Sequence, residues 1–246
     1  MKALLSLLAT FVLSACTAGS DAVPADTGGT ADSTMVVPSE ARVPSPESGA
    51  RGSEGPRVVF LGTSLTAGMG LEGDEAGYVE VLDAMADSLG MPFQAVNAGV
   101  SGETSAGGLR RLDWVLREPM DVLVLELGAN DGLRGQDPQA LRSNLEAIID
   151  GTRTRYPDAR IVLAGMEAPP NLGPRYTEAF REVFPQVARD RDAVLVPFLL
   201  EGVAGVPKLN QEDRIHPTAE GHRRIARTVW PYLEPLLKAE GPGDDR

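Results

Sequence analysis

Five short apolar runs, separated by segments of helical periodicity, dominate residues 57–240 and restrict what this chain can fold into. The runs show almost no polar alternation, which is typical of strands that are buried on both faces of a sheet. They lie at 57–61, 92–99, 120–128, 159–166 and 193–198. Strands that alternate with helices form right-handed βαβ units, so the pattern predicts one parallel sheet covered by helices on both faces.

Helices are expected over 75–89, from about Ser105 to 118, and over 137–156, 173–192 and 216–240. Asp137 and Pro138 form an N-cap followed by a first-turn proline, whereas Pro185 is expected to kink or divide its helix. The last helix is expected to begin at Pro217. The fold class is therefore α/β: three layers (α/β/α) around a flavodoxin-like five-stranded parallel sheet in the order 2-1-3-4-5.

The two ends of the chain have a different composition from the domain at 57–240. Residues 1–16 are predicted to be a signal peptide, because a short basic start is followed by the apolar run "ALLSLLATFVLSA", which is too short to span a bilayer. Its end, "LSAC", resembles the lipobox of bacterial lipoproteins and makes Cys16 the expected lipidation site. A plain signal peptide with an incidental cysteine is the alternative. Residues 17–56 and 241–246 are expected to be a disordered linker and tail, because they are rich in small, polar and glycine residues.

Polar residues follow the predicted strands, at the edge of the sheet where α/β proteins bind their ligands. The residues that could carry chemistry there are Ser64; Asn97, Gly99, Ser101 and Gly102; Gly128, Asn130 and Asp131; and Asp213 and His216. The net charge of −12 excludes nucleic acid as an expected partner, because phosphates require a basic face.

The stretch "VVFLGTSLTAGMG" at 58–70 could be a phosphate loop, a strand end or the site of a nucleophile. A Walker loop needs Gly-Lys-Ser/Thr after its glycine, and the dinucleotide fingerprint needs G-x-G-x-x-G. Neither spacing is present, and the G-x-S-x-G elbow of α/β-hydrolases is also absent. A nucleophilic Ser64 remains, provided that the chain supplies a base.

The chain has two histidines that could act as this base, His216 and His222. His222 is expected on the solvated face of the last helix. His216 follows Asp213 in an Asp-x-x-His arrangement, and Pro217 favours a loop position for it. The aspartate could fix the tautomer of the ring. On spacing alone, a surface turn that caps a helix is the favoured explanation.

A tetrahedral intermediate also needs hydrogen-bond donors for its oxyanion. The candidates are the backbone N–H groups of Ser64 and Gly102 and the side-chain amide of Asn130. A turn glycine and an Asx turn are the structural alternatives for the last two.

Together the blocks "GTSLTAG", "NAGVSGETS", "ELGANDGLRG" and "DRIHP" closely resemble the SGNH (GDSL-type) hydrolases, over about residues 57–238. The branch that this chain is most similar to contains arylesterases, lysophospholipases and acyl-CoA thioesterases. The resemblance implies a catalytic serine at Ser64, a base at His216 oriented by Asp213, and an oxyanion hole from Ser64, Gly102 and Asn130. It implies no metal or other cofactor.

One residue departs from the family pattern: Thr63 stands where Gly-Asp-Ser-Leu has its aspartate. This change leaves the nucleophile in place but puts the local hydrogen bonds of the turn in question. The walls of the substrate pocket are expected from 69–78, 132–137 and 169–178. The apolar residues of those segments are Met69, Leu71, Leu133, Pro169, Pro170 and Leu172.

The expected function is hydrolysis of aryl esters, short or medium acyl esters or lysophospholipids by an exported, membrane-anchored monomer. Export makes a cytoplasmic acyl-CoA thioester a poorer candidate substrate than an ester. Two alternatives remain open: a carbohydrate O-acetyl esterase, and a lipoprotein that binds acyl chains or glycans on a degenerate hydrolase fold.

Overall fold

The computed structural model describes residues 55–238. The predicted signal peptide, Cys16, most of the linker and the tail lie outside the described residues. Within them, no helix is long and apolar enough to cross a membrane.

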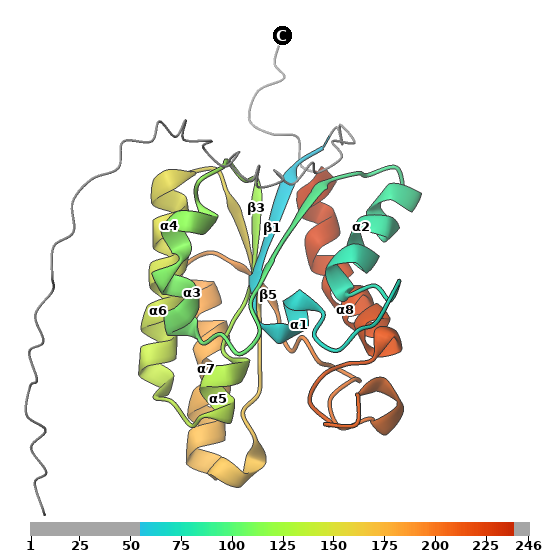
Figure 1. Cartoon of the computed structure of the whole chain (residues 1–246). Coiled ribbons are helices and arrows are strands. Elements are labelled where there is room, and N and C mark those ends of the chain that lie inside the picture. Colours follow the sequence, from blue (N-terminus) through green and yellow to red (C-terminus); the bar gives the residue numbers. More distant parts are fainter. Residues whose placement is uncertain (1–54, 239–246) are drawn as a thin grey trace, which may run out of the picture. The chain divides into compact units, whose positions relative to one another are not determined.

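The five predicted strands form one parallel sheet (Figure 1). Their bounds are β1 Arg57–Gly62, β2 Gln94–Gly99, β3 Val122–Glu126, β4 Arg160–Ala164 and β5 Val194–Val196. The strand order β2-β1-β3-β4-β5 confirms the prediction. Gly62 pairs in register with Gly99 on one side and with Glu126 on the other, so these three strand ends are level. The loops that follow them therefore meet at one edge of the sheet.

Two layers of helices cover the sheet, with α2 and α8 on one face and α3, α4, α6 and α7 on the other (Figure 1). The α-helices are α1 Ser64–Ala67, α2 Tyr78–Ser88, α3 Ser105–Arg110, α4 Leu112–Val115, α5 Ala129–Leu133, α6 Pro138–Arg155, α7 Pro174–Asp190 and α8 Ala219–Lys238. Two 3₁₀ turns, η1 Pro170–Leu172 and η2 Pro207–Leu209, lie in the loops after β4 and β5. Because β1 and β3 are buried between both layers, their residues form the centre of the core.

Several helices differ from the prediction. Helix α2 begins at Tyr78 rather than at residue 75. The segment at 103–118 forms two short helices, since α3 ends at Arg110 and α4 begins at Leu112; the Arg111 between them donates from its guanidinium to Glu103 and to the carbonyl of Ala98. Helix α7 is not divided at Pro185, since its apolar face is held in the core on both sides of that residue. Helix α8 begins two residues later than expected, because Pro217 pairs in an extended bridge with Asn210.

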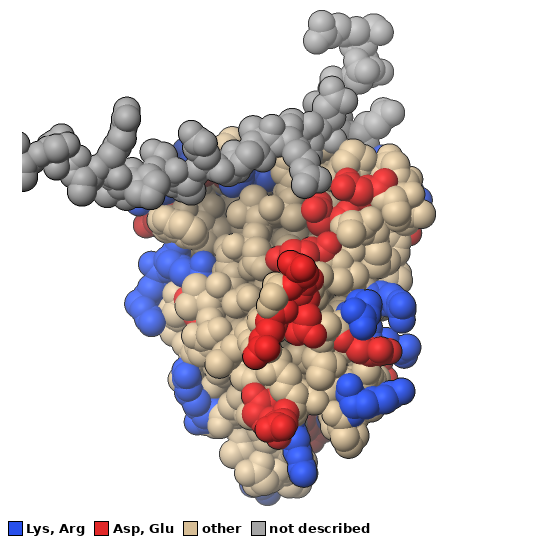
Figure 2. Space-filling view, turned by 45° about the vertical axis from the view of Figure 1, so that its right-hand side comes forward, with Lys and Arg blue, Asp and Glu red and all other residues tan. Residues whose placement is uncertain are grey.

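The surface charge is unevenly distributed. Acidic side chains form a stripe down the face shown in Figure 2, and basic side chains lie toward its margins. Exposed acids also follow one another in the loop before α2, at Glu72, Asp74 and Glu75. These features accord with the negative net charge of the chain.

Candidate active site

Ser64 is the first residue of α1, directly after the turn that ends β1. The hydroxyl of Thr63 caps this helix by accepting the N–H of Leu65 at 3.4 Å. The turn is so tight that a Cβ on Gly62 would lie 2.0 Å from Thr66 Oγ1. A glycine is therefore required before Thr63, and it lets α1 pack directly on the end of the sheet.

A hydrogen-bonded chain links the three residues expected to form a triad. His216 Nε2 lies 3.0 Å from Ser64 Oγ, and His216 Nδ1 lies 2.5 Å from Asp213 Oδ2. The other carboxylate oxygen of Asp213 accepts the N–H groups of Ile215 and His216, at 2.9 and 3.0 Å. These bonds, the one from His216 first, lower the pKa of Asp213 to about 2. The carboxylate is thus ionised and holds the ring with its second nitrogen toward Ser64.

The loop that carries His216 is fastened to the loop after α1. The side-chain amide of Gln211 donates to the carbonyls of Met69 and Pro217, at 2.8 and 2.9 Å. The backbone N–H of Gln211 donates to the carbonyl of His216 at 2.7 Å. Because Met69 follows α1 closely, these bonds set the separation of His216 from Ser64 across 152 positions of sequence.

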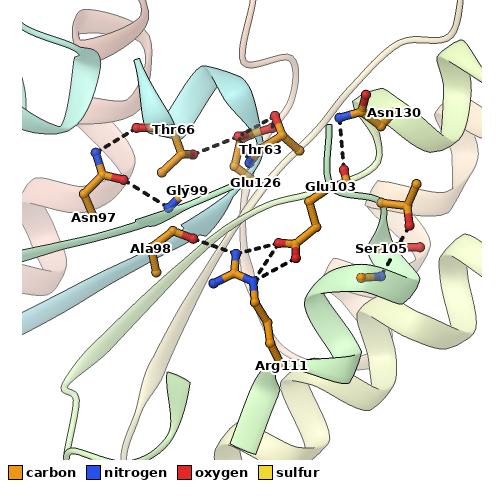
Figure 3. Close-up of polar contacts among 12 residues, drawn as sticks. Thr63, Thr66, Asn97, Ala98, Gly99, Glu103, Ser105, Arg111, Glu126 and Asn130 are labelled. Atoms are coloured by element: carbon orange, nitrogen blue, oxygen red, sulfur yellow. Dashed lines mark hydrogen bonds and ion pairs between the residues drawn. The ribbon is translucent and has the colours of Figure 1, made fainter. Parts of the chain in front are cut away.

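The candidate oxyanion donors, on α1, on the loop after β2 and on α5, line the same cavity. Gly102 has a φ of +77°, a left-handed conformation that favours glycine. Its carbonyl accepts from Arg134 at 2.9 Å, while Asn130 Nδ2 donates to the carbonyl of Glu103 at 3.0 Å (Figure 3). An amide group carries two N–H donors, so Asn130 keeps one for a ligand. The loop after β2 is thus tied to the helix after β3.

Two further contacts hold this part of the structure, and the one made by Glu103 is drawn in Figure 3. The carboxylate of Glu103 accepts from Arg111, which also donates to the Ala98 carbonyl at the end of β2. Asp131 accepts both the backbone N–H and the hydroxyl of Ser105, at 2.9 and 2.6 Å. Sequence analysis named Asp131 as a strand-end residue, and the structure shows that it anchors the start of α3.

A buried carboxyl group lies directly beneath the nucleophile turn, and sequence analysis did not identify it. Glu126 is fully buried at the end of β3 and accepts from the Thr63 N–H at 2.8 Å and from both the Thr63 and Thr66 hydroxyls (Figure 3). Burial raises its pKa to about 7, against the effect of these donors. The one sequence signal was an acid, Glu126, that follows four apolar residues within the run at 120–128.

Thr63 therefore supplies three contacts that could not be read from sequence: a helix cap, a backbone donor and a hydroxyl donor to Glu126. An aspartate at this position would face the Glu126 carboxyl with a second negative charge. The threonine hydroxyl instead donates to it, which resolves the question raised by the departure from Gly-Asp-Ser-Leu.

The prediction for His222 is wrong, because this side chain is fully buried rather than solvated. Its Nδ1 accepts the backbone N–H of Tyr78 at 3.2 Å, and its ring stacks on the Tyr78 ring with centroids 6.4 Å apart. Burial lowers its pKa to about 4, so the ring is neutral at pH 7. Helix α8 packs on α2 through this contact, and helical spacing alone could not show which face was covered.

The candidate catalytic residues open into a cavity of about 780 Å³. Of the expected wall residues, Met69, Leu133, Pro169 and Pro170 line it, whereas Leu71 and Leu172 do not. Two parts of the wall were not predicted from the sequence: the segment that follows β5, and the residues between Asp213 and His216. The additional lining residues include Met166, Phe198, Leu200, Ala204, Arg214 and Ile215. The walls are therefore mainly apolar, although Glu167, Asn210 and Arg214 also line them. Between residues 55 and 238 no group of three or more histidine, cysteine or acidic side chains is arranged to hold a metal ion.

Comparison with known proteins places this geometry in a family. The GDSL-like Lipase/Acylhydrolase family matches residues 60–224. Esterase TesA of Pseudomonas aeruginosa is 44% identical over 181 residues, covering 73% of this chain and 89% of the esterase. Thioesterase 1/protease 1/lysophospholipase L1 of Escherichia coli is 37% identical over 182 residues, covering 73% of this chain and 84% of its own.

A solved structure agrees with these sequence relatives. The crystal structure of TesA superimposes with a TM-score of 0.69 at 42% identity, covering 73% of this chain and 99% of that one. Sequence and architecture thus match over nearly the whole of the described domain. The chain belongs to the GDSL-like lipase/acylhydrolase family and is a carboxylic ester hydrolase.

Proposed function

We propose that this protein hydrolyses carboxylic esters through an acyl-enzyme formed on Ser64. The observation that supports this most strongly is the chain of contacts from Ser64 Oγ to His216 Nε2 and from His216 Nδ1 to Asp213. His216 takes the proton of Ser64 as its oxygen attacks the ester carbonyl, and then gives that proton to the leaving alcohol. Water repeats the sequence on the acyl-enzyme and releases the acid.

The charge that develops on the carbonyl oxygen is stabilised by the N–H groups of Ser64 and Gly102 and by the Asn130 amide. All three residues line the cavity that contains Ser64. Their loops are fixed by Arg134 and by the Asn130 bond to Glu103. Donors held in place before the reaction need no reorganisation as charge develops, which is the basis of this kind of catalysis.

The acyl or aryl group of the substrate occupies the apolar part of the cavity. Its walls, which include Leu133, Met166, Pro169 and Phe198, suit a hydrocarbon or aromatic group. Aryl esters, short and medium acyl esters and lysophospholipids share this feature. The names of the Escherichia coli relative include both a thioesterase and a lysophospholipase, so thioesters belong among the substrates to be tested.

A fluorophosphonate probe tests the nucleophile directly. The wild type should be labelled and should hydrolyse p-nitrophenyl esters with a burst of product, whereas Ser64→Ala should show neither. His216→Ala should be comparably inactive because the residues act as a unit. Full activity of the Ser64→Ala protein would refute the assignment. A wild type that binds these esters but neither turns them over nor reacts with the probe would instead indicate a binding protein on a degenerate hydrolase fold.

Profiling separates the substrate classes. Rates with p-nitrophenyl esters from two to sixteen carbons, with phenyl acetate and with acetylated xylose would be compared. An apolar cavity of this size predicts higher kcat/KM for aryl or medium-chain esters than for the acetylated sugar. Preference for the acetylated sugar would favour the carbohydrate O-acetyl esterase alternative.

We also propose that the enzyme is exported and anchored as a lipoprotein through Cys16. The support is the apolar leader that ends in Leu-Ser-Ala-Cys, followed by a linker rich in small and polar residues. Mass spectrometry of the mature N-terminus should find a diacylglycerol adduct on Cys16, and Cys16→Ser should release the enzyme from the membrane fraction. An unmodified N-terminus distant from Cys16 would contradict the proposal. Gel filtration of the released enzyme tests the expected monomer.

A further inference from the structure

We propose that Arg214 makes the enzyme favour esters whose leaving alcohol carries a phosphate group. This inference rests on the proposed function of the Ser64 site and deepens it by assigning one end of the cavity to a charged leaving group. Nothing in the proposed triad or the oxyanion hole requires a cation at this position.

Arg214 lies close in sequence to the residue that would protonate the leaving group. It lines the same cavity as Ser64 and is exposed there, two residues before His216. In the proposed mechanism His216 donates a proton to the leaving oxygen. The leaving alcohol therefore extends past His216, toward the segment that contains Arg214 and Ile215.

The backbone of Arg214 is held in a conformation that most residues avoid. Its φ is +60°, in the left-handed region, and only Asp192 shares such a value among the other non-glycine residues from 55 to 238. In the same turn Asp213 accepts the N–H groups of Ile215 and His216. Glycine would satisfy the turn without strain. A long cationic side chain at a strained position beside the reacting groups points to a role for the side chain.

The guanidinium of Arg214 is also available to a ligand. Among the residues that the structure describes, it forms no ion pair or side-chain hydrogen bond. Of the acids near the cavity, Glu167 is paired with Arg181 at 3.2 Å, and Asp213 is occupied by His216. The chain as a whole carries more acidic than basic residues, and a stripe of acids is visible in Figure 2. Arg214 is thus a cation that lines the cavity itself, where a phosphate on the substrate could meet it.

The chemistry of the two groups matches. A planar guanidinium offers paired N–H donors that fit the oxygens of a phosphate, and such charge-assisted bonds are stronger than neutral ones. The apolar walls of the cavity would hold the acyl chain. An acyl glycerol phosphate therefore fits with its ester at Ser64, its acyl chain among the apolar walls and its phosphate at Arg214.

The test compares two soluble substrates that differ only in the phosphate: 1-hexanoylglycerol 3-phosphate and 1-hexanoylglycerol. The readout is the ratio of their kcat/KM values. Arg214→Gln removes the charge but keeps an unbranched polar side chain, and should lower this ratio about tenfold, mostly through KM. Arg214→Lys should retain most of the ratio. Lys208→Gln removes a nearby exposed cation that does not line the cavity, and should leave the ratio unchanged.

The effect should also weaken in 1 M salt, where charges are screened within about 3 Å. An unchanged ratio in Arg214→Gln, or an equal loss with Lys208→Gln, would overturn the proposal. Arg214→Gly provides a second measurement that does not depend on strain: it relaxes the turn and should lose the ratio to the same extent as Arg214→Gln. The Ser64→Ala variant distinguishes failure of the proposed function from failure of the proposal for Arg214. Hydrolysis that persists in Ser64→Ala would refute catalysis by Ser64, whatever the role of Arg214.

Discussion

Two buried titratable groups should give this enzyme opposite pH dependences of stability that nearly offset each other. Glu126 has a pKa raised from 4.5 to about 7 in the fold, and His222 has one lowered from 6.5 to about 4. Both are fully buried. They are linked through Thr66, whose hydroxyl bonds to Glu126 and to the Tyr78 hydroxyl, and through Tyr78, whose N–H donates to His222. Neither group is among the causes of the other's pKa shift.

The signs follow from which state binds more protons. For Glu126 the folded state holds the proton more tightly, so its contribution to stability is lost as pH rises from 4.5 to 7. For His222 the unfolded state binds the proton more tightly, so its contribution is lost as pH falls from 6.5 to 4. Between pH 5 and 7 linkage gives a loss of about 2 kcal/mol from Glu126 and a gain of about 2 kcal/mol from His222.

Single substitutions should therefore expose each slope. In Glu126→Gln the amide can accept the Thr63 N–H and donate to a threonine hydroxyl, so the fold is kept while titration is lost. Its free energy of unfolding, relative to the wild type, should rise by about 2 kcal/mol from pH 5 to pH 7. In His222→Asn the side-chain oxygen can replace Nδ1 as acceptor for Tyr78. Its stability relative to the wild type should fall by about 2 kcal/mol over the same range.

The assay is urea unfolding of the full-length protein, followed by circular dichroism at pH 5, 6, 7 and 8. Other titrating groups are common to all the variants and cancel in the differences. The double variant should follow the wild-type profile from pH 5 to 7, because the two slopes are removed together. Profiles of the single variants that run parallel to the wild type within about 0.5 kcal/mol would refute the reasoning.

Three further results are expected. Asn130→Ala should lower kcat about 10²- to 10³-fold with little change in KM for p-nitrophenyl butyrate, since one oxyanion donor is lost; an equal loss through KM alone would argue for ground-state binding instead. Asp213→Asn should reduce kcat about 10³-fold by favouring the wrong tautomer of His216; a kcat equal to that of the wild type in the same assay would contradict the role of Asp213. Gly62→Ala should prevent normal folding, because its Cβ would lie 2.0 Å from Thr66 Oγ1 and 2.6 Å from Glu126 Oε2; a soluble protein with wild-type thermal stability would contradict that close approach.

Some features of the candidate site could be predicted from short sequence patterns. The apolar run, the glycine and the serine at 58–64 predicted a strand that ends in a tight turn, and the structure has β1 followed by α1 there. The Asp-x-x-His spacing predicted a carboxylate beside the ring of His216, which the structure shows. Both are contacts between residues close in sequence, so their spacing carries the information.

Other features depend on partners far away along the chain. Helix 103–118 breaks at Arg111 because that side chain reaches Glu103 and the end of β2. The cavity wall after β5 was missed because apolar residues in a loop give no sign of what they will face. The left-handed conformation of Arg214 could not be predicted either, because the residue type alone does not determine the φ angle.

The sequence by itself determined the architecture of this protein: the two periods of its apolar residues, together with the handedness of βαβ units, leave one parallel sheet and one edge at which Ser64, Gly102, Asn130 and His216 can gather. Tertiary structure alone decided the environments. It buried His222, placed Glu126 under Thr63 and left Arg214 in the cavity without a partner among the described residues. The physical reason is that a period reports which face of an element is apolar, whereas burial, pKa and free charge depend on the elements packed against that face.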